Sequence, residues 1–397
     1  MKQGRSLLTQ EKSIIIIGSG PVGTRILRDL LRIRPEAAVT IYGDEPWEPY
    51  DRVKLVSLLC GDLSWADLTN LPPLPKPNNV TLKSSNRIVA IDRDNRQITD
   101  SFGDRQTYTK LILATGSNPW IPSIPGINFS GVHAFRNVGD VRGLLDKSYK
   151  GQRVIVLGGG LLGVELACGL QKKGQQVTVV VSDRLLGRQL DDRAAELLNK
   201  HLHSLGIEVI FGRASEILGS PNKEGKMTAH SVQTFSKQII ACDCVVLATG
   251  IMPATDLALG CGLATGRGIK VNNYLQTSDP LIYAVGECAE HRGRVYGLIG
   301  PGFEQSDIAA QNVLGGRVKY SGSAVVAQLK GADIAAFSCA REELENQMET
   351  RSISYESRDH TQYRSLQLNK GHLTGVVCIG GYPLKVGQIK KLTAHNP

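Results

Sequence analysis

The stretch Ile-Ile-Ile-Ile-Gly-Ser-Gly-Pro-Val-Gly at residues 14–23 constrains this chain more than any other. Its four isoleucines predict a short buried strand. Gly18, Gly20 and Gly23 follow in the G-x-G-x-x-G spacing, before a helix predicted over 22–34. A strand, a tight turn and a helix in this order can place a pyrophosphate at the positive end of the helix. Because the chain holds 43 glycines, one such match is also compatible with an ordinary strand–helix turn.

The pattern returns later in the chain as Arg-Val-Ile-Val-Leu-Gly-Gly-Gly-Leu-Leu-Gly. Gly158, Gly160 and Gly163 repeat the glycine spacing there. A later buried strand in each half ends in Ala-Thr-Gly, at 114–116 and at 248–250. A chance repeat of strand, glycine turn and helix is improbable, so the sequence predicts two dinucleotide sites or a duplicated fold.

Length and composition limit the remaining possibilities. The 397 residues exceed the roughly 250–300 at which a single core stops growing, so two or three domains are expected. The net charge of +9 favours acidic or phosphate-bearing partners. The basic residues are scattered, however, which argues against a nucleic-acid partner. No apolar run approaches the roughly 18 residues of a membrane span, and the polar start, 1–12, is interpreted as a disordered tail.

The eight cysteines lack the spacing of a disulfide framework, and no C-x-x-C pair occurs. Free thiols in a reducing cytoplasm are therefore favoured over disulfides, and no metal site is predicted. A lone-cysteine mechanism at Cys60 remains an open alternative.

Candidate ligand-binding carboxylates follow two predicted strands. Glu45, or Asp44 beside it, comes after the strand predicted over 38–42 and can accept hydrogen bonds from a ribose hydroxyl. Glu287 follows Gly286 at the end of another strand. The alternatives are a plain loop carboxylate for the first two and a helix N-cap for Glu287. Further strands are predicted over 81–92, 97–102 and 108–114 as a small meander, over 176–181, and, after residue 320, in short segments.

These features together resemble the pyridine nucleotide-disulfide oxidoreductase superfamily, whose reductases bind FAD in a first unit and a nicotinamide nucleotide in a second. Three segments are also similar to the FAD portion of the assimilatory NAD(P)H nitrite reductase large subunit, and the chain resembles rubredoxin and ferredoxin reductases as well. The segments are Trp-Glu-Pro-Tyr-Asp-Arg at 47–52, Gly-Arg-Gln-Leu-Asp at 187–191, and Tyr-Ala-Val-Gly-Glu-Cys-Ala-Glu-His-Arg-Gly-Arg-Val-Tyr-Gly at 283–297.

The resemblance implies an α/β fold with two Rossmann-like dinucleotide-binding domains and a small C-terminal α+β domain. The FAD domain would comprise 13–118 and 251–319, the NAD(P) domain 119–250, and the C-terminal interface domain 320–397. Three prolines between 119 and 125 mark the first boundary.

Carried over by position, the resemblance also implies binding residues for each nucleotide. Those for FAD are Gly18, Gly20, Pro21, Gly23, Asp44, Glu45, Arg52, Ile88, Ala114, Thr115, Gly116, Gly286 and Glu287. Those for NAD(P)H are Gly158, Gly160, Leu161, Leu162, Gly163, Ser182, Arg184 and Gly250.

Two positions bear on catalysis and one on nucleotide choice. Glu165 occupies the place where the family has a carboxylate near the nicotinamide, although a glutamate in a first helical turn is also a common response to the helix dipole. Relatives have Leu-Ser-Lys where this chain has Leu-Val-Ser at 55–57, so Lys54 is the remaining candidate beside the flavin. Val181 stands where NAD-preferring sites carry an acid, and Arg184 can bind a 2′-phosphate, which favours NADPH or dual use.

The sequence thus predicts an FAD-dependent NAD(P)H oxidoreductase that passes electrons to a ferredoxin, a rubredoxin, or a sirohaem or iron–sulfur reductase subunit. Nitrite itself would be reduced on a partner, because no cysteine cluster is present to bind an iron–sulfur module. The alternative from another class is a protein that binds FAD without turnover and serves to hold a partner.

Overall fold

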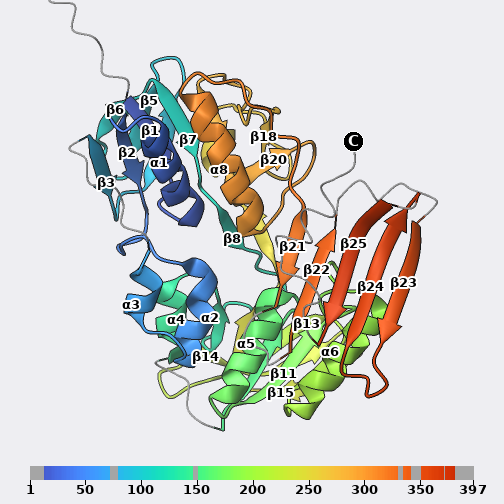
Figure 1. Cartoon of the computed structure of the whole chain (residues 1–397). Coiled ribbons are helices and arrows are strands. Elements are labelled where there is room, and N and C mark those ends of the chain that lie inside the picture. The colour runs from blue at the N-terminus through green and yellow to red at the C-terminus, as the bar shows by residue number, and fades with distance from the viewer. Residues whose placement is uncertain are drawn as a thin grey trace, which may run out of the picture. The chain divides into compact units, whose positions relative to one another are not determined.

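The computed structural model describes residues 13–71, 79–145, 151–329, 334–340, 350–370 and 372–380. The chain folds as two compact units (Figure 1). Unit 1 comprises residues up to 51, 69–117 and 253–322, and unit 2 comprises 52–68, 118–252 and the chain from 323. The predicted tail, 1–12, lies outside the described residues.

Unit 1 is built on a five-stranded sheet in which every neighbouring pair is parallel. The strands, in spatial order, are β19 (Ile282–Ala284), β7 (Lys110–Leu113), β1 (Ser13–Ile17), β2 (Ala38–Tyr42) and β3 (Val80–Lys83). The first strand of the sequence therefore lies at the centre, where it pairs on both edges.

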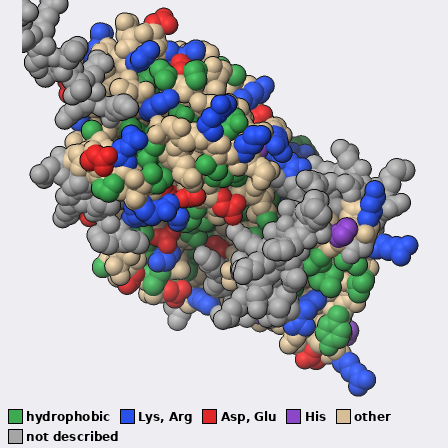
Figure 2. Space-filling view, turned by 45° about the horizontal axis from the view of Figure 1, so that its top comes forward, with side chains coloured by type: hydrophobic (Ala, Val, Ile, Leu, Met, Phe, Trp, Pro, Cys, Tyr) green, Lys and Arg blue, Asp and Glu red, His purple; other side chains and the backbone are tan. Residues whose placement is uncertain are grey.

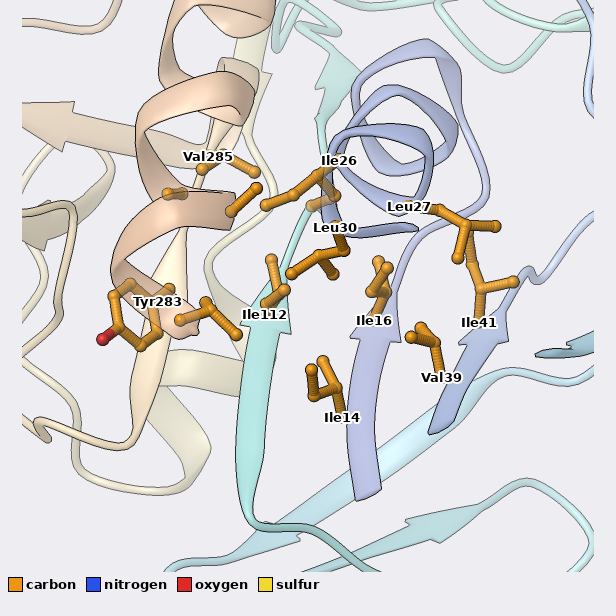
Figure 3. Packing of buried hydrophobic residues seen from close by; sticks show 14 of the residues in the cluster. Ile14, Ile16, Ile26, Leu27, Leu30, Val39, Ile41, Ile112, Tyr283 and Val285 are labelled. Carbon is orange, nitrogen blue, oxygen red and sulfur yellow. The ribbon is translucent and has the colours of Figure 1, made fainter. Parts of the chain in front are cut away.

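The isoleucine run of β1 is buried on both faces of this sheet. Ile14 and Ile16 pack with α1 (Pro21–Ile33), whose Ile26 and Leu30 lie over them in Figure 3. Ile15 belongs, with Ile17, to a second cluster on the opposite face. This follows from the two-residue period of a strand, and each buried side chain contributes about 1.5–3 kcal/mol. α8 (Ile299–Val313) packs beside α1 over the same sheet.

A small antiparallel sheet interrupts unit 1 between β3 and β7. It consists of β4 (Ile88–Asp92), β5 (Gln97–Asp100) and β6 (Arg105–Thr107). The prediction of one strand over 81–92 was wrong, because Ser85 takes a positive φ of 53° and the chain turns there. The N–H groups of Ser85 and Asn86 donate to the carbonyls of Glu45 and Gly43 at this turn. β3 and β7 consequently belong to the parallel sheet and not to the meander.

The remaining elements of unit 1 are short. They are β18 (Ile269–Val271), β20 (Ala289–His291), α7 (Asp256–Gly260) and the 3-10 helix η2 (Gly286–Cys288). The strands β8 (Ser117–Pro119) and β17 (Ile251–Pro253) fall where the chain passes from one unit to the other.

Unit 2 repeats the strand order of unit 1. Its parallel sheet runs β9 (Val132–Ala134), β16 (Cys244–Leu247), β10 (Arg153–Leu157), β11 (Gln176–Val181) and β12 (Glu208–Phe211). A second antiparallel meander lies between β12 and β16 in sequence, as β4–β6 lie between β3 and β7. It consists of β13 (Ala214–Pro221), β14 (Met227–Thr234) and β15 (Ile239–Ala241). One difference stands out: the outer strand β9 comes before β10 in sequence, whereas its counterpart β19 comes last.

Among the described residues of unit 2, five helices and one 3-10 turn occur. They are η1 (Arg52–Lys54), α2 (Leu55–Cys60), α3 (Trp65–Thr69), α4 (Val138–Leu145), α5 (Leu161–Lys172) and α6 (Asp192–Ser204). α2 packs against α5 and α4.

The chain after residue 320 forms a five-stranded antiparallel sheet. Its order is β21 (Val325–Gln328), β22 (Ala336–Ala340), β25 (His372–Ile379), β24 (Tyr363–Asn369) and β23 (Thr350–Glu356). The described residues of this segment hold strands and turns but no helix. The two Rossmann-like sheets confirm the predicted α/β fold class.

Candidate functional site

The first glycine turn joins β1 to α1 with no room for side chains at two of its three glycines. Gly18 has φ of +112°, and a Cβ there would overlap the carbonyl of Ala114. A Cβ on Gly23 would overlap the carbonyl of Gly18 itself. Gly20 differs, because a Cβ there would meet no protein atom within 4 Å. Protein packing therefore leaves this position open, which is compatible with the close approach of a ligand.

The helix that follows this turn begins without a side-chain cap. Gly20 is the N-cap residue of α1, Pro21 opens the first turn, and no acidic side chain lies in that turn. The turn therefore presents backbone N–H groups and the positive end of the helix dipole, which together suit a phosphate.

A second element of unit 1 reaches the same turn. A Cβ on Gly286, where φ is +82°, would press against the side chain of Val22 in the first turn of α1. Glu287 follows, and its carboxylate accepts a 2.6 Å hydrogen bond from the hydroxyl of Ser117. The predicted residues Gly286 and Glu287 thus lie next to the first turn of α1, in an arrangement that can accept hydroxyl groups of a ligand beside the phosphate turn.

The predicted ribose carboxylates, Asp44 and Glu45, follow the end of strand β2. Glu45 is partly buried and accepts a 2.7 Å hydrogen bond from the hydroxyl of Tyr50, whereas Asp44 is exposed. Gly43 precedes them, and a Cβ there would overlap the hydroxyl of Ser19, which lies inside the glycine turn. Glu45 is therefore held at the end of the strand next to the turn.

Other predicted residues of the first site line the ends of neighbouring strands. The Ala114 N–H donates to the carbonyl of Ile17, and the Thr115 hydroxyl donates to the carbonyl of Ala254 at 2.8 Å. Gly116 takes φ of +68°. Ile88 is buried at the start of β4, in the cluster that holds Ile17.

The second glycine turn reproduces the first in unit 2. Gly158 has φ of +118°, its N–H donates to the Val180 carbonyl at 2.9 Å, and a Cβ there would overlap the carbonyl of Ala248. Gly163 abuts Gly158 as Gly23 abuts Gly18, and Gly160 is open in the same way as Gly20. Gly160 is also the uncapped N-terminus of α5. Leu161 and Leu162 open that helix. The prediction of Glu165 in the first helical turn was wrong, because the helix begins at Leu161 and Glu165 lies partly buried in the second turn.

The residues that would select the nucleotide follow β11. Val181 is buried and packs close to Gly159, while Ser182 is exposed. The guanidinium of Arg184 bonds the carboxylate of Asp192 and donates to the Gly187 carbonyl at 2.9 Å. Because the Asp192 side chain is 92% exposed, this ion pair is weak and leaves Arg184 able to turn toward a ligand.

Two predicted residues lie in unit 2 at the start of α2. Arg52 donates a 3.1 Å hydrogen bond to the carbonyl of Arg136, and Lys54 is the N-cap residue of the helix. Gly250, after β16, takes φ of +114° and accepts a hydrogen bond from the Trp120 N–H.

Cys60 does not have the surroundings of a reactive thiol. Burial, and then the negative charge of Asp62, raise the pKa of Cys60 to about 11. Its sulfur also occupies the space next to Gly169 on α5, where a Cβ would overlap it. A thiol with this pKa is protonated at neutral pH, which argues against the lone-cysteine mechanism.

Other kinds of site are not seen in the part of the chain that the structure describes. Its His, Cys, Asp and Glu side chains form no group of three or more placed to hold a metal ion. Among the described helices, none has the length and apolar character needed to span a membrane. On the face shown in Figure 2, Lys and Arg side chains are interspersed with Asp and Glu.

Comparison with known proteins decides the family. The sequence model of the pyridine nucleotide-disulphide oxidoreductases matches residues 12–312. The chain belongs to this family. FAD and NAD(P)H are the cofactors that accompany membership.

Individual relatives refine the picture. The oxidoreductase is 36% identical over 375 residues to the nitrite reductase [NAD(P)H] of Bacillus subtilis, covering 93% of this chain but 46% of that protein. It is 30% identical to the rubredoxin-NAD(+) reductase of Acinetobacter baylyi, over 76% of this chain and 78% of that protein. The chain therefore spans about half the length of the nitrite reductase it matches.

Among solved structures, the fold is similar to that in a putidaredoxin reductase–putidaredoxin complex. The TM-score is 0.85 at 23% identity, over 97% of this chain and 94% of the other.

Ser117 and Gln305 are two residues that the sequence analysis missed. Ser117 holds Glu287, and Gln305 accepts a 2.7 Å hydrogen bond from the Gly286 N–H. For Ser117 a signal existed, because the first strand end reads Ala-Thr-Gly-Ser and the second reads Ala-Thr-Gly-Ile. For Gln305 there was none, since a glutamine within a helix is unremarkable in sequence.

Proposed function

We infer that this oxidoreductase takes hydride from NAD(P)H onto FAD and passes the electrons to a separate redox protein. The observation that carries this proposal is the pair of uncapped helix starts, at Gly20 in unit 1 and Gly160 in unit 2. In each case the N-cap residue is a glycine, and a Cβ on that glycine would meet no protein atom within 4 Å. A protein with two such turns can hold two dinucleotides at once.

The residues of unit 1 would hold FAD. The backbone N–H groups after Gly20 would bind its pyrophosphate, Glu45 a ribose hydroxyl, and Glu287 a hydroxyl of the ribityl chain. The Ser117 hydroxyl keeps the Glu287 carboxylate in place. When bound, FAD supplies acceptance of hydride and release of single electrons, chemistry that protein side chains do not provide.

The residues of unit 2 would hold NAD(P)H. The turn from Gly158 to Gly163 would bind the pyrophosphate, and Glu165 would orient the nicotinamide. Val181 adds no negative charge at the strand end, and Arg184 is available for a 2′-phosphate. We therefore expect NADPH or both nucleotides to serve as the hydride donor.

The acceptor is a metal-containing protein of the kind that its relatives' names suggest. The similarity to the nitrite reductase of Bacillus subtilis favours an iron–sulfur or sirohaem partner in nitrite or nitrate assimilation. The net charge of +9 suits an acidic electron carrier. All eight cysteines are free thiols, which fits a reducing cytoplasm.

A rubredoxin or ferredoxin reductase is the second candidate function. It is favoured by the rubredoxin-NAD(+) reductase, of which this chain covers 78%. A third reading, FAD held without turnover, stems from Val56 and Ser57, where relatives have a serine and a lysine.

Anaerobic addition of NADPH or NADH to the FAD-loaded chain tests the proposal. Loss of the flavin absorbance near about 450 nm within seconds to minutes is expected, and a flavin that neither nucleotide bleaches would refute the reductase function. Adding rubredoxin, ferredoxin or a sirohaem nitrite reductase subunit to the reduced protein then identifies the acceptor by which of them restores the absorbance.

A further inference from the structure

A buried amide connects the Gly286 turn, within the Tyr283–Gly297 segment singled out above, to Tyr320. The side chain of Gln305, on α8, is 1% exposed. Its Oε1 accepts the 2.7 Å hydrogen bond from the Gly286 N–H, and its Nε2 lies 3.4 Å from the hydroxyl oxygen of Tyr320. Because only the carbonyl oxygen of an amide can accept from an N–H, the bond to Gly286 identifies Oε1 as the end of the amide that faces the turn.

Tyr320 is held as firmly as the amide that it contacts. It is among the largest fully buried side chains, and its ring lies 4.8 Å from the ring of His291. Tyr296 approaches it edge-on at 6.4 Å. The Tyr320 N–H donates to the carbonyl of Asn273 at 2.7 Å. The hydroxyl of Tyr320 is thereby placed next to Gln305.

His291 completes this support through its stacking on Tyr320 and its hydrogen bond to Asn273. Burial, and then the charge of Arg292, lower the pKa of His291. The Oδ1 of Asn273 accepts from Arg292 Nε at 3.2 Å, so the 3.0 Å bond between that oxygen and His291 Nε2 has the imidazole as donor. His291 and Tyr296 thus pack against the ring of Tyr320, and Arg292 bonds Asn273, whose carbonyl accepts from the Tyr320 N–H.

The turn that this network supports has little stiffness of its own. Gly286 lies at φ of +82°, and glycine is the residue with the widest backbone freedom. Glu287 comes next, so rotation of the peptide before Gly286 would move both the carboxylate and its backbone. The hydrogen bond from the Gly286 N–H to Gln305 links that peptide to helix α8 and restricts its rotation.

We propose that Gln305 is a positioning residue for FAD, which sets the orientation of the Gly286–Glu287 turn and is itself oriented by Tyr320 resting on His291. This inference rests on the proposed function, since it takes FAD as the ligand of that turn. Gln305 does not touch the flavin on this proposal; it acts through the Gly286 N–H.

The test is the binding of FAD to the apoprotein, followed by flavin fluorescence, together with the visible circular dichroism of the bound flavin. Gln305→Leu leaves the buried Gly286 N–H without its acceptor, so the Kd for FAD is expected to rise by about tenfold or more. The visible dichroism should change as well, because it reports the geometry around the flavin. Tyr320→Phe keeps the ring packing but removes the hydroxyl, and should shift both quantities less and in the same direction.

Gln311→Leu is the matched control, since Gln311 lies on the same helix and bonds Asp307 instead. It should leave the Kd and the dichroism unchanged, and Kd for NADP⁺ should stay constant in all three variants. Unaltered FAD binding and dichroism in Gln305→Leu would overturn the inference alone. If that variant does not fold, unaltered values in Tyr320→Phe would overturn it. A wild-type chain that binds no FAD would overturn the proposed function, and this inference with it.

Discussion

The hydroxyl of Tyr363 donates a 3.0 Å hydrogen bond to Oδ2 of Asp191, while Oδ1 of the same carboxylate accepts from the Ala194 N–H at 2.9 Å. One side chain therefore caps α6 and ties it to β24 of the C-terminal sheet. Asp191 ends the Gly-Arg-Gln-Leu-Asp segment that the sequence analysis singled out. In the structure that aspartate has a stabilising role, because it joins α6 to β24.

Removing this carboxylate should destabilise unit 2 through two lost bonds. Asp191→Ala removes a helix cap, worth about 0.5–2 kcal/mol. Tyr363→Phe removes the partly buried hydrogen bond to Asp191, worth about 0.5–1.5 kcal/mol, together with weaker contacts of the hydroxyl to Ser354 and Ser365. Urea unfolding measures both. Tyr355→Phe is the control, because Tyr355 is 58% exposed on the neighbouring strand, and a loss there as large as in Tyr363→Phe would contradict the assignment.

The open glycines allow the two nucleotide sites to be separated. Gly20→Ala and Gly160→Ala place a methyl where no protein atom lies within 4 Å, and both backbones have negative φ. Each variant should fold with unchanged or slightly higher stability. Gly20→Ala should weaken FAD binding by about tenfold or more and spare NADP⁺, and Gly160→Ala should do the reverse. Equal effects of one variant on both ligands would speak against one site per turn.

The neighbouring glycines provide a contrasting pair. Gly18→Ala and Gly158→Ala force a Cβ onto a carbonyl oxygen at positive φ, so both should unfold the chain or lower its thermal midpoint markedly. A scan of melting temperature for the four alanine variants tests this division between packing glycines and ligand glycines.

Nucleotide choice should depend on Arg184. Arg184→Ala is expected to weaken binding of 2′,5′-ADP by about tenfold, with little effect on NADH. Asp192→Ala, which frees the guanidinium, should strengthen it by no more than a few fold, since an exposed ion pair is worth about 0–1 kcal/mol. Calorimetric titration of each variant provides the measurement, and an Arg184→Ala protein that binds 2′,5′-ADP normally would exclude the role.

Acid should loosen the contact between α6 and β23. The hydrogen bonds from Arg193, and then from His360, lower the pKa of Glu356 to about 2, from its usual value of 4.5. A depressed carboxyl pKa stabilises the fold above the unfolded value and loses that contribution as pH falls through the folded one. Stability should therefore decline between pH 4.5 and 2, and less steeply in Glu356→Gln. Glu224→Gln, in the turn between β13 and β14, should follow the wild-type curve.

Cys60 should be dispensable. With a pKa of about 11, the thiol is protonated at pH 7–9 and should react slowly with iodoacetamide. Cys60→Ser is expected to oxidise NAD(P)H at the wild-type rate. A loss of turnover in that variant, with FAD still bound, would revive a cysteine mechanism.

The sequence pattern predicted those parts of the structure that depend on residues close together in the chain. The isoleucine run at 14–17 and the glycine spacings reported both strand–turn–helix units, because β-branched residues and φ above zero leave few alternatives. The strand break at Ser85 escaped prediction, since it depends on carbonyls at Gly43 and Glu45, far away in sequence. Gln305 escaped for the same reason, because its role depends on the Gly286 N–H that the fold brings near. For Ser117 the sequence offered a difference between the two strand ends, but its partner Glu287 is likewise supplied by the fold.

The position of the outer strands has a consequence for synthesis of the chain. The strands of the parallel sheet of unit 2 all fall in one stretch of the chain, from β9 to β16, with the β13–β15 meander between β12 and β16, so they leave the ribosome in succession. That of unit 1 lacks β19 until the whole stretch between Leu113 and Ile282 has been made. Until then one edge of β7 has no partner, and an unpaired edge invites aggregation. A nascent chain stalled before residue 282 should accordingly depend on chaperones more than one released at full length.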